Sequence, residues 1–228
     1  MRIAEIYQSR QGEGLLAGTR SVFVRASGCN LRCWFCDTPY ASWQPEGEDL
    51  AVDEILRQVE QFDSRHVVIT GGEPMLFAEL VPLCAALKEA GRHITIETAG
   101  TLYLPVQCDL MSISPKLANS TPSEERAGAW AQRHEQTRGA PEVIEKLLSQ
   151  YDYQVKFVVD KPADCEEVQS YLDAFEKIDR ERVMLMPQGV DKEHLEEVAR
   201  WLVPYCERHR LRYCPRKQIE WFGLVRGT

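Results

Sequence analysis

The sequence lacks any apolar run long enough to cross a membrane, and its first residues, MRIAEIYQSR, lack the apolar stretch of a secretion signal. We therefore expect a cytoplasmic protein without a membrane partner. Basic residues are not in excess, because 27 Lys and Arg stand against 35 Asp and Glu, for a net charge of −8. That balance argues against a broad nucleic-acid-binding surface. No internal repeat or low-complexity linker divides the 228 residues, which predicts a single domain, 1–228, with a sizeable core.

A second C-x2-C motif is also missing, although the chain has eight cysteines. In a protein that is not secreted, cysteines indicate thiols or metal ligands rather than disulfides. Cys29, Cys33 and Cys36 form one C-x3-C-x2-C loop. The other five are spread along the chain, and buried or incidental thiols are the favoured interpretation, with Cys206 and Cys214 left open as additional ligands.

Runs rich in apolar and β-branched residues alternate with amphipathic stretches, which predicts βαβ units and a parallel sheet. The expected strands are 21–25, 66–70, 93–97, 109–113, 153–159 and 182–186. The expected helices carry apolar faces within 52–62, 80–87, 168–175 and 195–206, and Pro204 predicts a kink or a break in the last one. About six strands are too few for a closed eight-stranded barrel. A partial β/α barrel and an open doubly wound sheet both fit this pattern.

The segment 117–150 is polar and rich in Ala, Glu, Arg and Gln, and it begins with NSTPSEE, which is typical of a helix start. We interpret it as a helical insertion within the domain and as a candidate lid.

Polar motifs follow the expected strands at their carboxyl ends, where ligands bind in parallel α/β proteins. These motifs are Gly71-Gly72-Glu73-Pro74, Thr98, Ser114 with Lys116, and Gln188, and the cysteine loop follows 21–25 in the same way. Glu73 suits an ammonium group and Lys116 a carboxylate. Taken singly, each motif is equally typical of a turn; taken together, they predict one ligand site.

Three thiolates cannot fill all four iron positions of a cubic [4Fe–4S] cluster, so one iron stays open to a reactant. The alternative is a zinc module, for which a distant Cys or His must supply the fourth ligand.

The ordered motifs QGEG (11–14), SVFVRASGCNLRCWFCDT (21–38), TGGEP, ETAGT, SPK and MPQG carry a resemblance. The chain resembles the radical S-adenosylmethionine (SAM) superfamily and, within it, the family of 7-carboxy-7-deazaguanine synthases. The resemblance implies a partial parallel β/α barrel of about six strands. It implies that the three loop cysteines hold a [4Fe–4S] cluster. It further implies that SAM is bound by Gly71, Gly72, Glu73, Thr98, Ser114, Lys116 and Gln188.

The implied reaction is the conversion of 6-carboxy-5,6,7,8-tetrahydropterin to 7-carboxy-7-deazaguanine with loss of ammonia, in the pathway to queuosine and related 7-deazapurines. SAM is regenerated in this reaction. The implied substrate-binding residues are Gln11, Glu13, Gly14, Arg25 and Thr228, and Thr38 is the implied protein ligand of a Mg²⁺ ion, which commonly uses few protein ligands.

Arg25 suits the pterin carboxylate because a guanidinium binds a carboxylate with two hydrogen bonds; the alternative interpretation of Arg25 is an ion pair at a strand end. Gln218 stands where relatives often have His. A homodimer and an electron donor such as flavodoxin are the implied partners. A glycyl-radical activating enzyme, which acts on a protein, is the alternative function.

Overall fold

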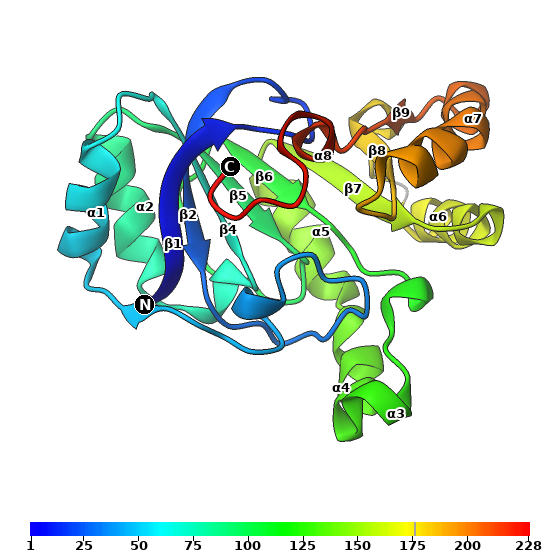
Figure 1. Cartoon of the computed structure of the whole chain (residues 1–228), viewed down its shortest axis with the longest axis horizontal. Helices are drawn as coiled ribbons and strands as arrows, with labels where there is room; N and C mark the ends of the chain where they lie inside the picture. The colour runs from blue at the N-terminus through cyan, green and yellow to red at the C-terminus, as the bar shows by residue number, and fades with distance from the viewer. Residues whose placement is uncertain (176) are drawn as a thin grey trace.

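The structure is a computed structural model that describes residues 1–175 and 177–228. Its centre is a nine-stranded sheet in the order β3-β1-β2-β4-β5-β6-β7-β8-β9. The six predicted strands are confirmed as neighbours that run parallel to one another. They are β2 (Arg20–Ala26), β4 (His66–Gly71), β5 (His93–Thr98), β6 (Leu110–Ile113), β7 (Tyr153–Val159) and β8 (Val183–Pro187). The sheet curves but does not close, as expected of a partial barrel (Figure 1).

Three strands at the sheet margins were not predicted: β1 (Arg2–Arg10), β3 (Glu48–Asp49) and β9 (Arg212–Tyr213). β1 is the long one, and it pairs antiparallel with β2. Its side chains are mostly half-buried and mix charged with apolar residues, so neither alternation nor a continuous apolar run indicates it.

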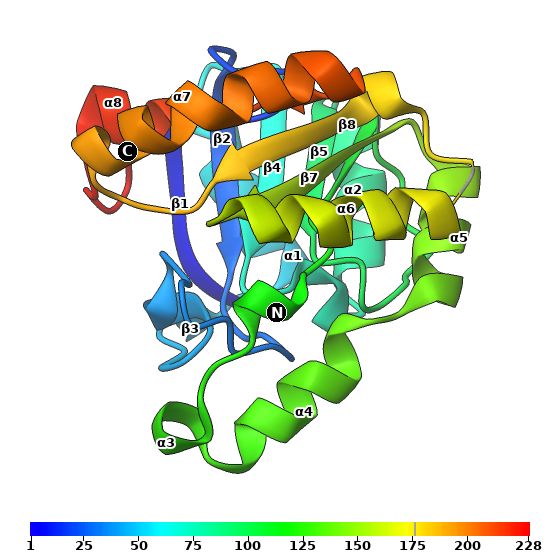
Figure 2. The ribbon, with the colours of Figure 1, turned by 90° about the vertical axis from the view of Figure 1, so that its right-hand side faces the viewer.

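Helices cover the outer side of the curved sheet (Figures 1 and 2). Four of them match the predicted faces: α1 (Val52–Glu60), α2 (Leu80–Glu89), α6 (Pro162–Ala174) and α7 (Lys192–His209). α7 continues through Pro204, so the predicted break is wrong. The central strands are apolar because helices cover one face and loop or cavity residues the other; Ile69, Ile96 and Phe157 are completely buried.

The segment 117–150 contains η3 (Ala118–Ser120), α3 (Glu124–Ala127), α4 (Ala129–Arg138) and α5 (Pro141–Gln150). The Ser123 side chain caps α3 by accepting a hydrogen bond from the Arg126 amide. α5 differs from the others, because Ile144 and Leu147 lie in the main core; it is the crossover helix between β6 and β7. The projecting part is therefore η3 to α4, which extends beyond the sheet (Figure 2).

The remaining short elements lie around the carboxyl ends of the strands or in connections. They are η1 (Pro39–Ala41), η2 (Pro74–Leu76), η4 (Arg180–Arg182) and α8 (Lys217–Phe222). Within the described ranges, no helix has both the length and the apolar character needed to span a membrane.

Candidate active site

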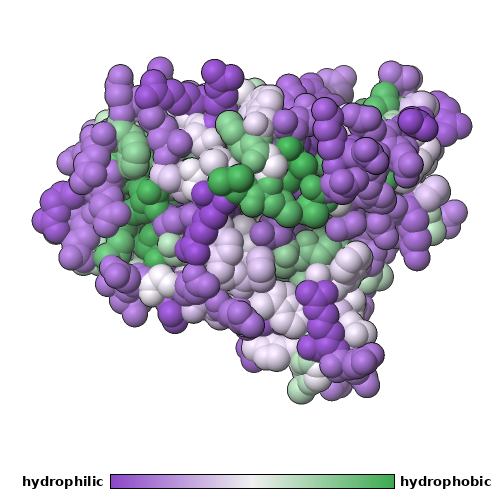
Figure 3. Space-filling model, in the orientation of Figure 1, coloured by the Kyte–Doolittle hydropathy of each residue, from purple (hydrophilic) through white to green (hydrophobic). Residues whose placement is uncertain are grey.

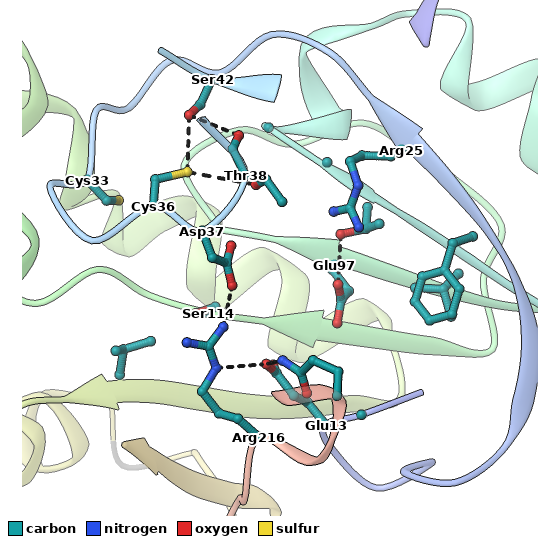
Figure 4. Close-up of a pocket in the computed structure, with 18 of the residues that line it drawn as sticks. Glu13, Arg25, Cys33, Cys36, Asp37, Thr38, Ser42, Glu97, Ser114 and Arg216 are labelled. Carbon is teal, nitrogen blue, oxygen red and sulfur yellow. Dashed lines mark hydrogen bonds and ion pairs between the residues drawn. The ribbon is translucent and has the colours of Figure 1, made fainter. Parts of the chain in front are cut away.

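A cavity of about 600 Å³ opens at the carboxyl ends of the parallel strands. It is lined by residues of the cysteine loop, the strand ends, the 11–13 turn and the C-terminal tail. Most of the predicted site residues share this lining: Gln11, Glu13, Arg25, Cys29, Cys33, Cys36, Thr38, Gly71, Gly72, Thr98, Ser114, Lys116, Gln188 and Thr228. Gly14 and Glu73 are absent from it. Cys33 and Cys36 lie at one side of the cavity, away from Glu13, Arg25 and Glu97 (Figure 4).

The three loop cysteines are free thiols. Burial raises the pKa of Cys29 to about 12 and that of Cys33 to about 11. The Cys36 sulfur lies 3.1 Å from the Ser42 hydroxyl. Within the described residues, the thiols are not gathered at the spacing of a metal site.

The donor set nevertheless fits an iron–sulfur cluster. All three thiols face one cavity, and thiolates are the usual ligands of such clusters. The other five cysteines do not belong to the cavity lining in the described part of the chain. Four of them are buried in the core or in a smaller satellite cluster, so the hypothesis that Cys206 or Cys214 adds a ligand is not supported. The loop therefore offers three thiolates and leaves one coordination position of a cubic cluster to another group.

Gly71 and Gly72 allow two backbone segments to meet. A Cβ on Gly72 would lie 2.0 Å from the Gly28 carbonyl oxygen, and one on Gly71, where φ is +130°, would lie 2.0 Å from the Ala26 oxygen. The Gly72 amide donates to Ala26 O at 3.0 Å, and the Glu73 amide donates to Gly28 O at 2.8 Å. The end of β4 is thus joined by hydrogen bonds to the start of the cysteine loop.

The Glu73 side chain is completely buried and does not reach the cavity. Its carboxylate accepts hydrogen bonds from the Met75 amide (3.1 Å), the Thr98 hydroxyl (2.8 Å) and the Ala99 amide (2.8 Å). Burial raises the pKa of Glu73, and these hydrogen bonds oppose that shift. The expectation that this carboxylate is open to an ammonium group is therefore corrected: its hydrogen bonds fix the ends of β4 and β5.

Lys116 also lines the cavity, and its ammonium donates to the Ser114 hydroxyl at 2.8 Å and to the Ser114 carbonyl at 2.5 Å. The Ser114 amide donates to Thr98 O at 2.8 Å, and the Gln188 amide donates to Val159 O at 2.7 Å. These backbone bonds hold Ser114 and Gln188 at the ends of their strands, with both residues in the cavity lining.

Lys156 lines the cavity beside Glu13 and Glu97. The sequence alone did not identify it as a site residue. Its ammonium lies 3.0 Å from Glu13 and 3.1 Å from Glu97. Burial favours a neutral amine, but Glu97 and Glu13 raise the pKa of Lys156 above its usual value. Likewise burial alone would raise the pKa of Glu13, yet Lys156 and Arg216 lower it to about 2. Glu13 and Lys156 are therefore both charged, and the lysine inside the apolar run YQVKFVV was the sequence feature that could have indicated this site.

Arg216, also missed, links the two sides of the cavity. It pairs with Asp37 of the cysteine loop and lies 3.6 Å from Glu13 (Figure 4). The Glu13 carboxylate also accepts a hydrogen bond from the side-chain amide of Gln218 at 2.6 Å. Gln11 donates to the Ser21 hydroxyl at 2.9 Å and is buried. Gly14 lies behind this turn, where its amide approaches the Cys214 sulfur at 3.3 Å, so it shapes the turn and does not line the cavity.

Arg25 lines the cavity but is already paired. Its Nε donates to Glu5 at 2.7 Å and its Nη2 donates to the Tyr7 hydroxyl at 2.8 Å. Two nitrogens of the guanidinium are thus engaged inside the protein, as the ion-pair alternative expects, and the contact with a substrate carboxylate stays a prediction. Arg25 stands opposite Glu5 in the β1–β2 register, and this pairing was missed together with β1.

The C-terminal tail lies over the cavity. Arg226 pairs with Glu5 at 3.2 Å and with Glu46 at 2.9 Å, and Thr228 belongs to the lining. Apolar side chains gather on this face of the molecule (Figure 3), and Leu224 and Val225 of the tail are exposed. Thr38, the predicted Mg²⁺ ligand, also lines the cavity, with its hydroxyl 3.8 Å from the Cys36 sulfur.

An open, mostly parallel α/β sheet with a three-cysteine loop at its strand ends defines the radical SAM class of enzymes. A family model described as the Radical SAM superfamily matches residues 23–115. A 7-carboxy-7-deazaguanine synthase of Rhodopirellula baltica is 46% identical over 99% of this chain and 88% of its own length. The enzyme of that name from Halobacterium salinarum is 43% identical over 95% of this chain and 88% of its own length.

The chain belongs to the family of 7-carboxy-7-deazaguanine synthases. The crystal structure of QueE from Escherichia coli has the same fold, with a TM-score of 0.70 at 22% identity over 95% of this chain and 93% of that one. Membership of this radical SAM family implies a [4Fe–4S] cluster and SAM as cofactors. The comparisons do not favour the glycyl-radical activating alternative.

Proposed function

We propose that this enzyme converts 6-carboxy-5,6,7,8-tetrahydropterin to 7-carboxy-7-deazaguanine with loss of ammonia, in the biosynthesis of queuosine or related 7-deazapurines. One observation carries the proposal. The three loop thiols and the ion pairs of Lys156 with Glu13 and Glu97 line the same cavity. A radical generator and a polar pocket for a heterocycle therefore face each other.

Cys29, Cys33 and Cys36 are the proposed cluster ligands. When bound, the [4Fe–4S] cluster and SAM supply a radical that removes a hydrogen atom from the substrate. The high pKa values of Cys29 and Cys33 mean that these thiols are protonated in the metal-free protein. Iron binding therefore releases protons from the loop.

The proposed SAM contacts lie between the loop and the strand ends. Gly71 and Gly72 line the cavity there, and their lack of a side chain lets this turn lie against the start of the cysteine loop. Glu73 supports this turn through its three hydrogen bonds, while Lys116 offers an ammonium for a carboxylate. Thr98, Ser114 and Gln188 complete the proposed lining.

Glu13 is the proposed partner of the aminopyrimidinone edge of the pterin. It is ionised at neutral pH because its pKa is about 2, so it accepts hydrogen bonds from ring and amino N–H groups. Lys156 fixes Glu13 and Glu97 in place. Gln11, Arg25 and Thr228 are proposed to enclose the rest of the substrate, with the carboxylate toward Arg25. Gly14 contributes by shaping the turn.

Mg²⁺ at Thr38, a homodimer and an electron donor such as flavodoxin remain parts of the proposal that come from the family resemblance. Thr38 supports the first because its hydroxyl lines the cavity close to the loop. The ion is tested by measuring turnover after chelation and after adding Mg²⁺ back. Sedimentation of the purified chain tests the dimer.

The decisive experiment is anaerobic incubation of the iron-reconstituted protein with SAM, a strong reductant and the pterin, followed by product mass analysis. We expect a product that is lighter than the substrate by one ammonia, with SAM recovered. Cys33→Ala should abolish turnover, whereas Cys108→Ala, which changes a cysteine outside the cavity, should keep it. A wild-type protein with intact iron and sulfide that leaves the pterin unchanged would contradict the proposal.

A further inference from the structure

His134 of α4 connects the projecting segment to the cysteine loop. It is completely buried. Its Nδ1 accepts a hydrogen bond from the Arg32 backbone amide at 3.0 Å, and its Nε2 lies 2.9 Å from the Ser120 hydroxyl. That hydroxyl is 2.6 Å from the Leu117 carbonyl oxygen, to which it donates.

These bonds define one tautomer. Because Nδ1 accepts, the ring proton lies on Nε2 and is donated to Ser120. Every group in the chain of bonds is then satisfied with a neutral imidazole. Burial lowers the pKa of His134 to about 4, against an opposing effect of Glu135, so the ring is neutral at pH 7. Arg138 and Lys116 are the other charges that affect it.

The same segment contacts the loop at further points, all close to Trp34. The Trp34 amide donates to Ser120 O at 3.1 Å, and its indole N–H donates to Asn119 O at 2.6 Å. Arg126 donates to the Trp34 carbonyl at 2.8 Å. The backbone between the first and third cysteines is therefore held from outside the barrel by η3, α3 and α4.

An aromatic contact adds to these bonds. The Arg32 guanidinium lies over the Trp130 ring of α4, 3.9 Å from its centroid. Both the amide and the side chain of Arg32 thus contact α4. Arg32 stands between Cys29 and Cys33, so these contacts hold the stretch of the loop that joins two of the thiols.

We propose that the segment 118–138 is a brace for the cysteine loop and that His134 is its positioning residue, which holds the Arg32 amide so that the three thiols are arranged for the cluster. The inference rests on the proposed function for the identity of the cluster. It assigns the projecting segment to the metal site and not to a lid over the substrate. The observation that carries it is the hydrogen bond from the Arg32 amide to Nδ1 of His134, whose ring is completely buried.

The test compares His134→Phe, which keeps an aromatic ring but offers no acceptor, with His134→Asn, whose side-chain oxygen can take the place of Nδ1. Gln136→Ala, an exposed change on the same helix, is the matched control. The first measurement is hydrogen exchange of peptides covering 30–36 in the iron-free full chain. The second is the rate at which a chelator removes iron from the reconstituted protein without oxygen.

We expect His134→Phe to speed both exchange and iron loss by about tenfold or more, because the part-buried Arg32 amide is left without its acceptor. We expect His134→Asn to restore both to within about threefold of the unchanged protein, and Gln136→Ala to match it. If His134→Phe does not fold, Ser120→Ala replaces it and should speed both measurements by about threefold. Equal behaviour of the Phe and Asn variants, or unchanged rates in both, would overturn the inference.

The exchange measurement needs no cluster. If the unchanged protein takes up no iron, the proposed function fails, yet the exchange result still shows whether His134 holds the loop.

Discussion

Lys156→Met removes the ammonium that lies between Glu13 and Glu97 in the cavity wall. The change keeps a long side chain but leaves two carboxylates near each other, with Glu13 largely buried at 17% side-chain exposure. Removing one partner of a buried ion pair is costly, because the other charge stays in a poorly solvated place. We therefore expect this variant to be clearly less stable than the unchanged protein.

The magnitude follows from the pKa of Glu13, which falls from 4.5 to about 2 in the folded protein. Each tenfold change in proton affinity corresponds to about 1.4 kcal/mol, so the surroundings stabilise this carboxylate by about 3 kcal/mol. Lys156 provides most of it, since it lies at 3.0 Å and Arg216 at 3.6 Å. The attraction between Glu97 and Lys156 is left out of this figure, because Glu97 is 34% exposed and solvent screens its charge. The expected loss is about 2 to 3 kcal/mol.

Urea unfolding of the cluster-free protein at pH 7.5 measures this loss. The pKa of Glu13 is depressed on folding, so its stabilisation is present above pH 4.5 and is lost as the pH falls toward 2. The difference between Lys156→Met and the unchanged protein should therefore shrink below about pH 4.5. Adding Glu13→Gln should recover part of the loss, and Lys192→Met, an exposed change, should have little effect. A loss under about 1 kcal/mol at pH 7.5 would refute this reasoning.

Three more predictions follow from other contacts. Gly72→Ala should destabilise the protein by about 1–3 kcal/mol because its Cβ would meet the Gly28 carbonyl; Gly139→Ala, with open space around it, should change the unfolding free energy by less than about 0.5 kcal/mol. The pKa of His134 falls from 6.5 to about 4 on folding. As the pH is lowered from 6.5 to 4, the unfolded chain therefore takes up a proton that the folded chain does not, and the free energy of unfolding falls. Urea unfolding should show that the cluster-free protein loses about 2 kcal/mol more than His134→Asn between pH 7 and pH 5; equal losses would contradict this. Arg25→Ala should raise the KM for the pterin about tenfold with SAM binding unchanged in calorimetry, and an unaltered KM would remove Arg25 from substrate binding.

The parallel core was predictable because strands covered on both faces are apolar runs. Strand β7 was predicted with its observed bounds, Tyr153–Val159. The carboxyl-end rule then brought the cysteine loop, the glycines and Lys116 to one cavity. These predictions depend only on local patterns and on a general property of parallel sheets.

The contacts that the sequence did not indicate are made between residues far apart in the chain. Lys156 pairs with Glu13, 143 residues earlier, and no local pattern encodes that contact. The internal partner of Arg25 was missed because β1 was not foreseen, and with it the Glu5 side chain that faces Arg25 across the strands. Glu73 was read as a ligand group, although burial and three hydrogen bonds turn it inward.

The backbone bonds from Gly72 to Ala26 and from Glu73 to Gly28 give the site a mechanical property. The proposed cofactor turn and the metal loop are joined by main-chain bonds, so neither can shift alone. We expect a ligand that orders one of them to order the other, and thermodynamic reciprocity then makes the effect of each occupant on its neighbour equal in both directions. Assembly of the two cofactors should accordingly be cooperative, and an engineer who moves either motif must move both.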